Sequence, residues 1–432
     1  MMKRFLFALA LMLVFCSCAS QGYYNRLDNL MASGSCPAVV AHVQTNEDEY
    51  GNKARLLYLM DAAMVNLMCR NYDQGNQYFH KAEVLGEELW TKSVSQFALS
   101  MVTNDLVISY PGEDFERALI NLFSAICYLK LDQYDDALVE CRRLDTLLSG
   151  YNAKYDRKNI YKEDAFGRYL SGIIHESVNE LDDAYIAYYK AWEVYQDYHS
   201  AYGTPTPAQL AEDLLRAAES VDRLEEALSL VAGERPAGYI KSSEAREKGK
   251  VVLIHFNGRS PVKVEKKFTV PTLEGPISIA FPEYVVRPVS CRQSSLVVES
   301  GTQRFEARTE LAEDINEIAV KCLADRKARI WVKAVARAVA KQAAINKIVE
   351  QQEGNNRQLA KFILNTVNTM AIERADTRTW RTLPAEIYIS RMFVPQGDCR
   401  IYVRQCGGSK ELLESVSLKA GETKYVVFTS AS

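Results

Sequence analysis

The sequence predicts a mostly α-helical N-terminal half, in which helical repeats form an irregular superhelix, followed by an α+β domain with a helical insertion. Two observations support this prediction. Over residues 22–231, apolar residues recur every three to four positions and Pro and Gly are rare, which indicates amphipathic helices. Beyond residue 250, short runs rich in β-branched residues surround a helical stretch at about 311–374, which is typical of an α+β domain.

The composition sets the size and excludes some classes of protein. The chain has 432 residues, of which 48% are hydrophobic and 25% are charged, so it can form two or three domains with ordinary cores. The net charge of −3 argues against a nucleic-acid partner, which would favour a strongly basic domain. Because no apolar run of about 18 residues follows the N-terminus, we expect no internal membrane-spanning helix.

The N-terminus resembles a bacterial lipoprotein signal. Two basic residues precede an apolar run from Phe5 to Phe15, and Ser17 stands before Cys18. This pattern predicts a signal peptide over residues 1–17 and acylation of Cys18, which makes membrane lipid a binding partner. Ala19 favours a protein of the cell envelope, lipid-anchored in the outer membrane and facing the periplasm. The alternative is an ordinary signal peptide that is cut nearby and releases the protein.

Three parts of the helical half share one spacing of small residues. A small residue in a first helix is followed, twelve positions later, by a second one in the next helix; the pairs are Ala63 with Gly75, Ala125 with Ala137, and Gly172 with Ala184. Small residues allow two helices to cross closely, so we expect Gly172 and Ala184 to touch, with His175 packed in the core. An antiparallel bundle can give such spacings by chance, but the constant interval favours tetratricopeptide-like repeats.

Composition shifts predict the domain boundaries. We expect a helical-repeat domain over 18–231, a polar linker over 232–249 and an α+β domain over 250–432 with its insertion at about 311–374. Thr206-Pro207 resembles a helix N-terminus and predicts one helix to about Val231. The predicted strands lie at 251–256, 262–270, 276–281, 294–307, 385–394, 399–405, 414–419 and 424–429.

The cysteines are interpreted mainly as buried thiols. Cys127 and Cys141 fall in strongly helical sequence, where a buried cysteine behaves as a small hydrophobic residue. An oxidising compartment permits disulfides, and a bond between Cys399 and Cys406, or between either and Cys291, is the candidate.

No motif for catalysis, metal binding or cofactor binding occurs in the sequence. It contains no P-loop, HExxH, GxSxG or dinucleotide fingerprint, and its five histidines are scattered. We therefore predict no catalytic residue, no metal and no cofactor. A Ser/His/Asp set stays open, because such a set is spatial and leaves no local pattern.

The segment from Ala375 to Ile387 is the most distinctive in the chain. Its candidate partner-binding residues are Asp376, Arg378, Trp380 and Arg381, because Trp and Arg dominate the energetics of protein interfaces. In the alternative interpretation, Trp380 fills the junction between helix and sheet while Asp376 and Arg378 pair locally.

A basic helix at 326–347 also has two interpretations. It either contacts anionic lipid or an acidic partner, or packs on the sheet with a solvated basic face, which we favour.

The distinctive segment, together with Asp114–Leu144 and Phe166–Trp192, resembles a family of bacterial tetratricopeptide-repeat-containing lipoproteins that has no established activity. The resemblance covers nearly the whole chain and implies an envelope location and a repeat fold. We therefore predict a lipid-anchored scaffold or adaptor of the cell envelope that binds a periplasmic or envelope protein through helical repeats, without catalysis. The alternative is an envelope enzyme, or a regulator of peptidoglycan or secretion machinery, with its site in the C-terminal domain.

Overall fold

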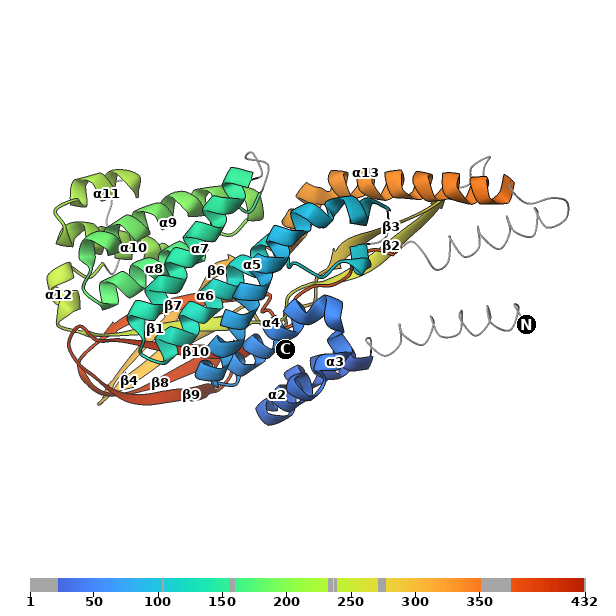
Figure 1. The fold of residues 1–432 in the computed structure, drawn as a ribbon. Coiled ribbons are helices and arrows are strands. Elements are labelled where there is room, and N and C mark those ends of the chain that lie inside the picture. The colour runs from blue at the N-terminus through green and yellow to red at the C-terminus, as the bar shows by residue number, and fades with distance from the viewer. Residues whose placement is uncertain are drawn as a thin grey trace.

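The computed structural model describes residues 22–102, 105–154, 160–231, 236, 239–270, 277–350 and 374–430. Cys18 and the predicted signal peptide lie outside these ranges. The described residues confirm a helical N-terminal half and a sheet-containing part after it (Figure 1). Within them, no helix combines the length and the hydropathy needed to cross a membrane.

The N-terminal half consists mainly of helix pairs. Residues 22–32, α2 (Cys36–Thr45), α3 (Glu47–Tyr50) and the short 3-10 helix η1 (Asn52–Ala54) come first. Four pairs follow: α4 (Arg55–Met68) with α5 (Tyr72–Val102), α6 (Asp114–Lys130) with α7 (Tyr134–Lys154), α8 (Ala165–Ser177) with α9 (Leu181–Tyr202), and α10 (Ala208–Ser220) with α11 (Leu224–Leu230). The 3-10 helix η2 (Asp105–Val107) lies between the first two pairs, and α12 (Ser242–Arg246) leads into the sheet.

All four pairs turn through the same backbone conformation. One residue of each turn has a left-handed φ of 57° to 64°; these residues are Arg70, Asp132, Asn179 and Asp222. A positive φ is uncommon outside glycine, so its recurrence at the same place identifies one repeated turn. The turn at Asp222 also shows that the predicted single helix to Val231 is wrong, because α10 ends before it and α11 begins after it.

The small residues let the paired helices approach closely. A Cβ atom on Gly75 would lie 3.4 Å from the carbonyl oxygen of Ala63, as expected for a crossing of α4 and α5. A Cβ atom on Gly172 would lie only 2.4 Å from Cδ1 of Tyr188. The closest neighbour of Gly172 is therefore the Tyr188 ring, one turn beyond Ala184, so the predicted contact between Gly172 and Ala184 is not the tightest at this crossing.

Two four-stranded sheets follow the helices. The first has the order β10-β1-β7-β6, with β10 (Thr423–Ser430) parallel to β1 (Gly249–Asn257) and antiparallel pairing of β1, β7 (Glu386–Val394) and β6 (Glu310–Asp314). The second is antiparallel, with the order β5-β4-β8-β9, and contains β4 (Ser294–Ser300), β5 (Gln303–Arg308), β8 (Gly397–Gln405) and β9 (Lys410–Leu418).

The first sheet lies between the helices and the second sheet (Figure 1). Alternate residues of a strand point to opposite faces, and β1 uses both faces. Val252, Ile254 and Phe256 belong to the core shared with the helices, whereas Val251 and Leu253 belong to the core between the sheets. The helical half and the first sheet are therefore held together by one continuous hydrophobic core.

An elongated arm extends from this body (Figure 1). It consists of the hairpin of β2 (Val262–Val270) and β3 (Ile277–Val285) and of the long α13 (Ile315–Glu350), which follows β6 and packs along β3. Trp331 of α13 lies 5.2 Å from the Phe281 ring, and Ala334 and Ala338 are buried beside Ile279. The basic helix thus packs on strands, as in the favoured interpretation.

The described residues form two disulfides, Cys291–Cys406 and Cys36–Cys69. The first is one of the predicted alternatives, whereas Cys399 is a buried thiol and forms no disulfide. Cys127 and Cys141 are buried thiols, as predicted. The Cys36–Cys69 bond was not among the predicted alternatives.

Candidate functional site

Trp380, the centre of the distinctive segment, is fully buried, with 0% of its surface exposed. Its ring meets Phe79 and Phe123 edge-on, at centroid distances of 6.3 and 6.0 Å. Its Nε1 donates to Oγ1 of Thr382 at 3.0 Å. A ring enclosed in this way has no surface to offer, so the prediction that Trp380 binds a partner is wrong, and Trp380 fills the junction of helices and sheet.

The charged residues of the segment bind other parts of the same chain. Arg378 pairs with Asp376 at 2.7 Å, and its Nη1 donates to the carbonyl oxygens of Lys53 and Ile108 at 2.9 and 3.0 Å. Arg381 pairs with Asp28 at 3.2 Å, and its guanidinium lies over the Tyr24 ring. These contacts therefore hold the N-terminal helices against the segment that precedes β7. The residues of the segment that form them are Asp376, Arg378 and Arg381.

Two buried carboxyl groups lie beside the segment. Glu116 accepts the backbone N–H of Trp380 at 2.8 Å, and Asp61 accepts the hydroxyl groups of Thr382 at 2.7 Å and Tyr50 at 2.8 Å. Burial raises the pKa of Glu116, and it raises that of Asp61 to about 6. Raised carboxyl pKa values can mark catalytic acids, but both groups are fully buried and satisfied by hydrogen bonds, which favours a structural role.

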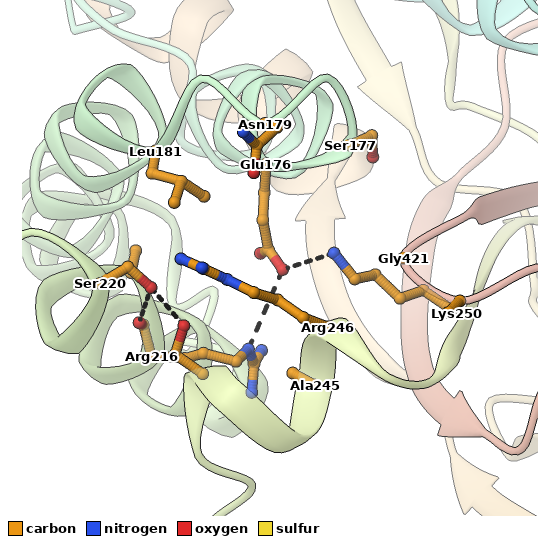
Figure 2. A pocket seen from close by; sticks show the side chains of 13 residues that line it. Glu176, Ser177, Asn179, Leu181, Arg216, Ser220, Ala245, Arg246, Lys250 and Gly421 are labelled. Atoms are coloured by element: carbon orange, nitrogen blue, oxygen red, sulfur yellow. Dashed lines mark hydrogen bonds and ion pairs between the residues drawn. The ribbon is translucent and has the colours of Figure 1, made fainter.

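A charged cavity lies between α8, α10, α12 and β1 (Figure 2). Its volume is about 370 Å³. The lining of the cavity combines charged side chains, hydroxyl groups, one amide and apolar residues, most of which are small. They come from Glu176, Ser177, Asn179, Leu181, Arg216, Ala217, Ser220, Ser242, Ala245, Arg246, Lys250, Ala420 and Gly421.

A network of buried ion pairs joins three lining residues of the charged cavity, Glu176, Arg216 and Lys250, to two residues outside the lining, Asp213 and Arg391. Glu176 lies 3.0 Å from Nζ of Lys250 and 2.8 Å from Nη2 of Arg391. Asp213 pairs with Arg216 and lies 2.9 Å from Nη1 of Arg391. Burial alone would raise the pKa of Glu176, but the surrounding cations, Arg391 first among them, hold it well below its usual value. Glu176 is therefore a carboxylate in the folded protein.

A groove between α5, α6 and α7 is the other candidate site; we call it the α5–α7 groove. Its volume is about 510 Å³. The guanidinium of Arg117 lies between two aromatic rings, 5.2 Å from the centroid of Trp90 and 5.4 Å from that of Tyr151. Val84 at the rim is 55% exposed, and Arg143 pairs with Glu83 across the groove. Arg, Trp and an exposed aliphatic side chain together are typical of a protein-binding surface.

The histidines give little support for catalysis. His255 is buried between two serines, with Nδ1 2.9 Å from Oγ of Ser294 and Nε2 2.8 Å from Oγ of Ser430. Burial lowers its pKa to about 4. A Ser–His pair can act in nucleophilic catalysis, but a serine on each ring nitrogen and 2% exposure leave a substrate no access. The structure therefore assigns His255 to the sheet core.

Within the described ranges, one group of side chains has the atom types that a metal ion prefers. His175, Glu180 and Asp183 place their ligand atoms within 4.8 Å of one another at the α8–α9 turn. His175 is partly buried, contrary to the prediction of a core residue, and its Nδ1 lies 2.7 Å from Glu180. The two acidic residues are exposed, and exposed acidic groups commonly lie this close without an ion, so the geometry does not assign a metal.

Comparison with known proteins gives no family. The chain matches no family model and no curated protein. Among the solved structures that match is the crystal structure of NprR in complex with its cognate peptide NprX, with 13% sequence identity and a TM-score of 0.19. The match covers 51% of this chain and 66% of that chain, just under two thirds of its length. A likeness at this TM-score does not bear on fold or function.

Proposed function

We propose that this protein is a lipid-anchored scaffold or adaptor of the bacterial cell envelope, which binds a segment of a protein partner through its helical repeats and performs no catalysis. The N-terminal signal pattern and Cys18 support the envelope location, most consistently the outer membrane with the body facing the periplasm. The resemblance to tetratricopeptide-repeat-containing lipoproteins supports the same assignment.

The geometry of the helix pairs supports a tetratricopeptide-like assignment. Each pair turns through one left-handed residue at an equivalent position, and three pairs carry small residues twelve positions apart. Such units cannot bury their apolar faces alone, so they stack and form extended surfaces. The fourth pair has Leu215 at the first small position and ends in the seven-residue α11, as expected of a terminal repeat. We interpret α13, between β6 and β7, as the helical insertion of the α+β domain.

The α5–α7 groove carries the proposal. Arg117 is held between Trp90 and Tyr151, so its guanidinium is fixed before a partner arrives, and less conformational entropy is lost on binding. Nη1 of Arg117 has no hydrogen-bond acceptor among the described residues, although it is buried. The occupant that fits is a protein segment with an aliphatic anchor beside Val84 and Trp90, and with a carbonyl or carboxylate oxygen for Arg117.

Site-specific photocrosslinking in intact envelopes tests this function. A photoreactive residue at Val84 should give one dominant adduct, and mass spectrometry should map it to a single segment of the partner. Ile186 on α9, which is 48% exposed and lies outside the groove, is the matched control position. A synthetic peptide of the mapped segment should bind the purified chain, and Trp90→Ala should abolish that binding.

Two outcomes would contradict the proposal. Equal adducts at Val84 and Ile186 would mean that the groove is not the docking surface. Turnover of peptidoglycan by the purified chain would mean that the protein is an enzyme.

A further inference from the structure

The charged lining residues of the cavity and the ion pairs that they form carry more positive than negative charge. Among the residues that the structure describes, three cations lie within ion-pair distance of two carboxylates; the cations are Arg216, Lys250 and Arg391, and the carboxylates are Glu176 and Asp213. Glu212 interacts electrostatically with Arg216 but forms no ion pair with it within the described part of the chain. Since an uncompensated buried charge is costly, this arrangement favours an additional anion.

Arg216 presents unused hydrogen-bond donors in the cavity. The residue is only 3% exposed, and its Nη2 donates to Asp213. Its Nε and Nη1 have no hydrogen-bond acceptor among the residues that the structure describes. Buried donors are almost always satisfied in folded proteins, by protein, by water or by a ligand. Nε faces Oε1 of Glu176 at 4.0 Å, so it is Nη1 of Arg216 that indicates where a further acceptor oxygen belongs.

Arg246 supplies a second cation from the other side. It projects from α12 across the cavity, with its guanidinium between Leu181 and Ser220 in Figure 2. The residue is exposed, and its guanidinium forms no ion pair within the described ranges. A guanidinium that is already placed over a cavity can close on a bound anion at little conformational cost.

The remaining lining defines the body of the ligand. Ser220 and Ser242 share a hydrogen bond of 2.5 Å, and the side chains of Ser177 and Asn179 add further polar groups. No aromatic ring belongs to the lining among the residues that the structure describes, and these residues therefore provide no stacking for a flat base or ring. A volume of about 370 Å³ is at the lower end of the range for small-molecule sites.

We propose that the charged cavity binds a small hydrophilic organic anion, whose carboxylate or phosphate group contacts Arg216 and Arg246 and whose hydroxyl groups face the serines. This site involves α8, α10, α12 and β1 and does not depend on partner binding in the α5–α7 groove. Burial lowers the pKa of Lys250, with the charge of Arg391 adding to the effect, and a bound anion would offset both.

Calorimetric titration of the full chain in neutral detergent tests the proposal. Glucuronate tests binding of a carboxylate, and glucose 6-phosphate tests binding of a phosphate group. Glucose and inorganic phosphate are the controls. At least one charged sugar should bind tenfold or more tightly than glucose and than inorganic phosphate. Arg246→Gln, which removes an exposed side chain, should weaken that binding about tenfold, or ~1.4 kcal/mol.

Arg223→Gln is the matched variant, because Arg223 precedes α11 and lies outside the cavity lining. It should bind the probes as the wild type does. The proposal fails if no charged sugar binds, if glucose binds equally well, or if Arg246→Gln binds like the wild type. Equal binding of inorganic phosphate would show that only charge is recognised and would overturn the assignment of an organic ligand.

Discussion

The backbone N–H of Trp380 donates a hydrogen bond of 2.8 Å to Oε1 of Glu116, a residue 264 positions earlier in the chain. Glu116 also completes the start of its own helix, where its Oε2 accepts the backbone N–H of Glu113 and the hydroxyl of Tyr110. One carboxyl group therefore joins the first turn of α6 to the segment that leads into β7.

Trp380→Ala should strongly destabilise the fold. The ring is enclosed by Phe79, Phe123 and other core residues, so its removal leaves a cavity, with an expected cost of about 3–5 kcal/mol in the free energy of unfolding. Trp90→Ala, at a partly exposed tryptophan of the α5–α7 groove, should cost clearly less. Chemical denaturation of both variants measures the difference, and equal costs would contradict the role of Trp380 in the junction.

Gly172→Ala should lower stability, whereas Gly150→Ala should not. A methyl group at Gly172 would meet the Tyr188 ring at 2.4 Å, which predicts a loss of about 1–3 kcal/mol. At Gly150, also within a helix, nothing lies within 4 Å of the added methyl group, so alanine should raise stability by up to ~1 kcal/mol. Thermal unfolding compares the two variants. A stability of Gly172→Ala at or above the wild type would refute the close contact.

Asp61 should make stability depend on pH. Burial raises its pKa from 3.8 to about 6 in the folded state, so the folded state holds this proton more tightly than the unfolded state. The tighter binding of this proton adds up to ~3 kcal/mol to the free energy of unfolding. This contribution is complete below about pH 4 and is lost as the pH rises to about 6. Relative to Asp61→Asn, the wild type should thus lose stability over this range. Asp48→Asn, at an exposed aspartate, should show no such trend, and a pH-independent difference at Asp61 would exclude the effect.

The two disulfides should contribute unequally. The Cys291–Cys406 bond spans 115 residues of sequence and Cys36–Cys69 spans 33, so the first closes the longer loop and removes more entropy from the unfolded chain. Replacing either pair by alanine should cost about 2–5 kcal/mol, with the larger cost for Cys291–Cys406. Alkylation of the unfolded, unreduced chain followed by mass spectrometry should leave those four cysteines unlabelled. Their labelling before reduction would be evidence against the bonds.

Acylation of Cys18 is a separate prediction that follows from the signal pattern. Cells grown with an alkyne fatty acid should label the wild type and not Cys18→Ala. Cys16→Ala removes a neighbouring cysteine as the matched control and should keep the label. Labelling that persists in Cys18→Ala, or is absent from the wild type, would show that the protein is not anchored at this residue.

The sequence predicts the helices and most strands because their signals are local. The period of apolar residues identifies α4 to α9, and β-branched runs identify β1 and β7. The spacing of small residues does not predict the turn at Asp222, because Leu215 stands where the other pairs have a small residue. Trp380 is ambiguous for a different reason: whether it is buried depends on α4 to α6, which lie hundreds of residues away.

The charged cavity has no contiguous motif, because the ion-pair network that includes its lining residues comes from four elements. This network combines Glu176, Lys250 and Arg391 with the Asp213–Arg216 pair. One sequence signal exists. Asp213 and Arg216 lie one turn apart on the same face as Leu210 and Ala217, so this face of α10 combines apolar residues with charge. Charged residues on a buried helix face need partners, and a search for such faces would have singled out α10.

The parallel pairing of β10 with β1 places the last strand that the structure describes beside the strand of its sheet that comes first in the sequence. Synthesis proceeds from the N-terminus, so about 165 further residues must be made after β1 before β10 begins. Until then, the edge of β1 that β10 will occupy is open, and it offers hydrogen-bonding groups to any other extended chain. A product that terminates before β10 would keep that edge of β1 unpaired and open to pairing with another chain.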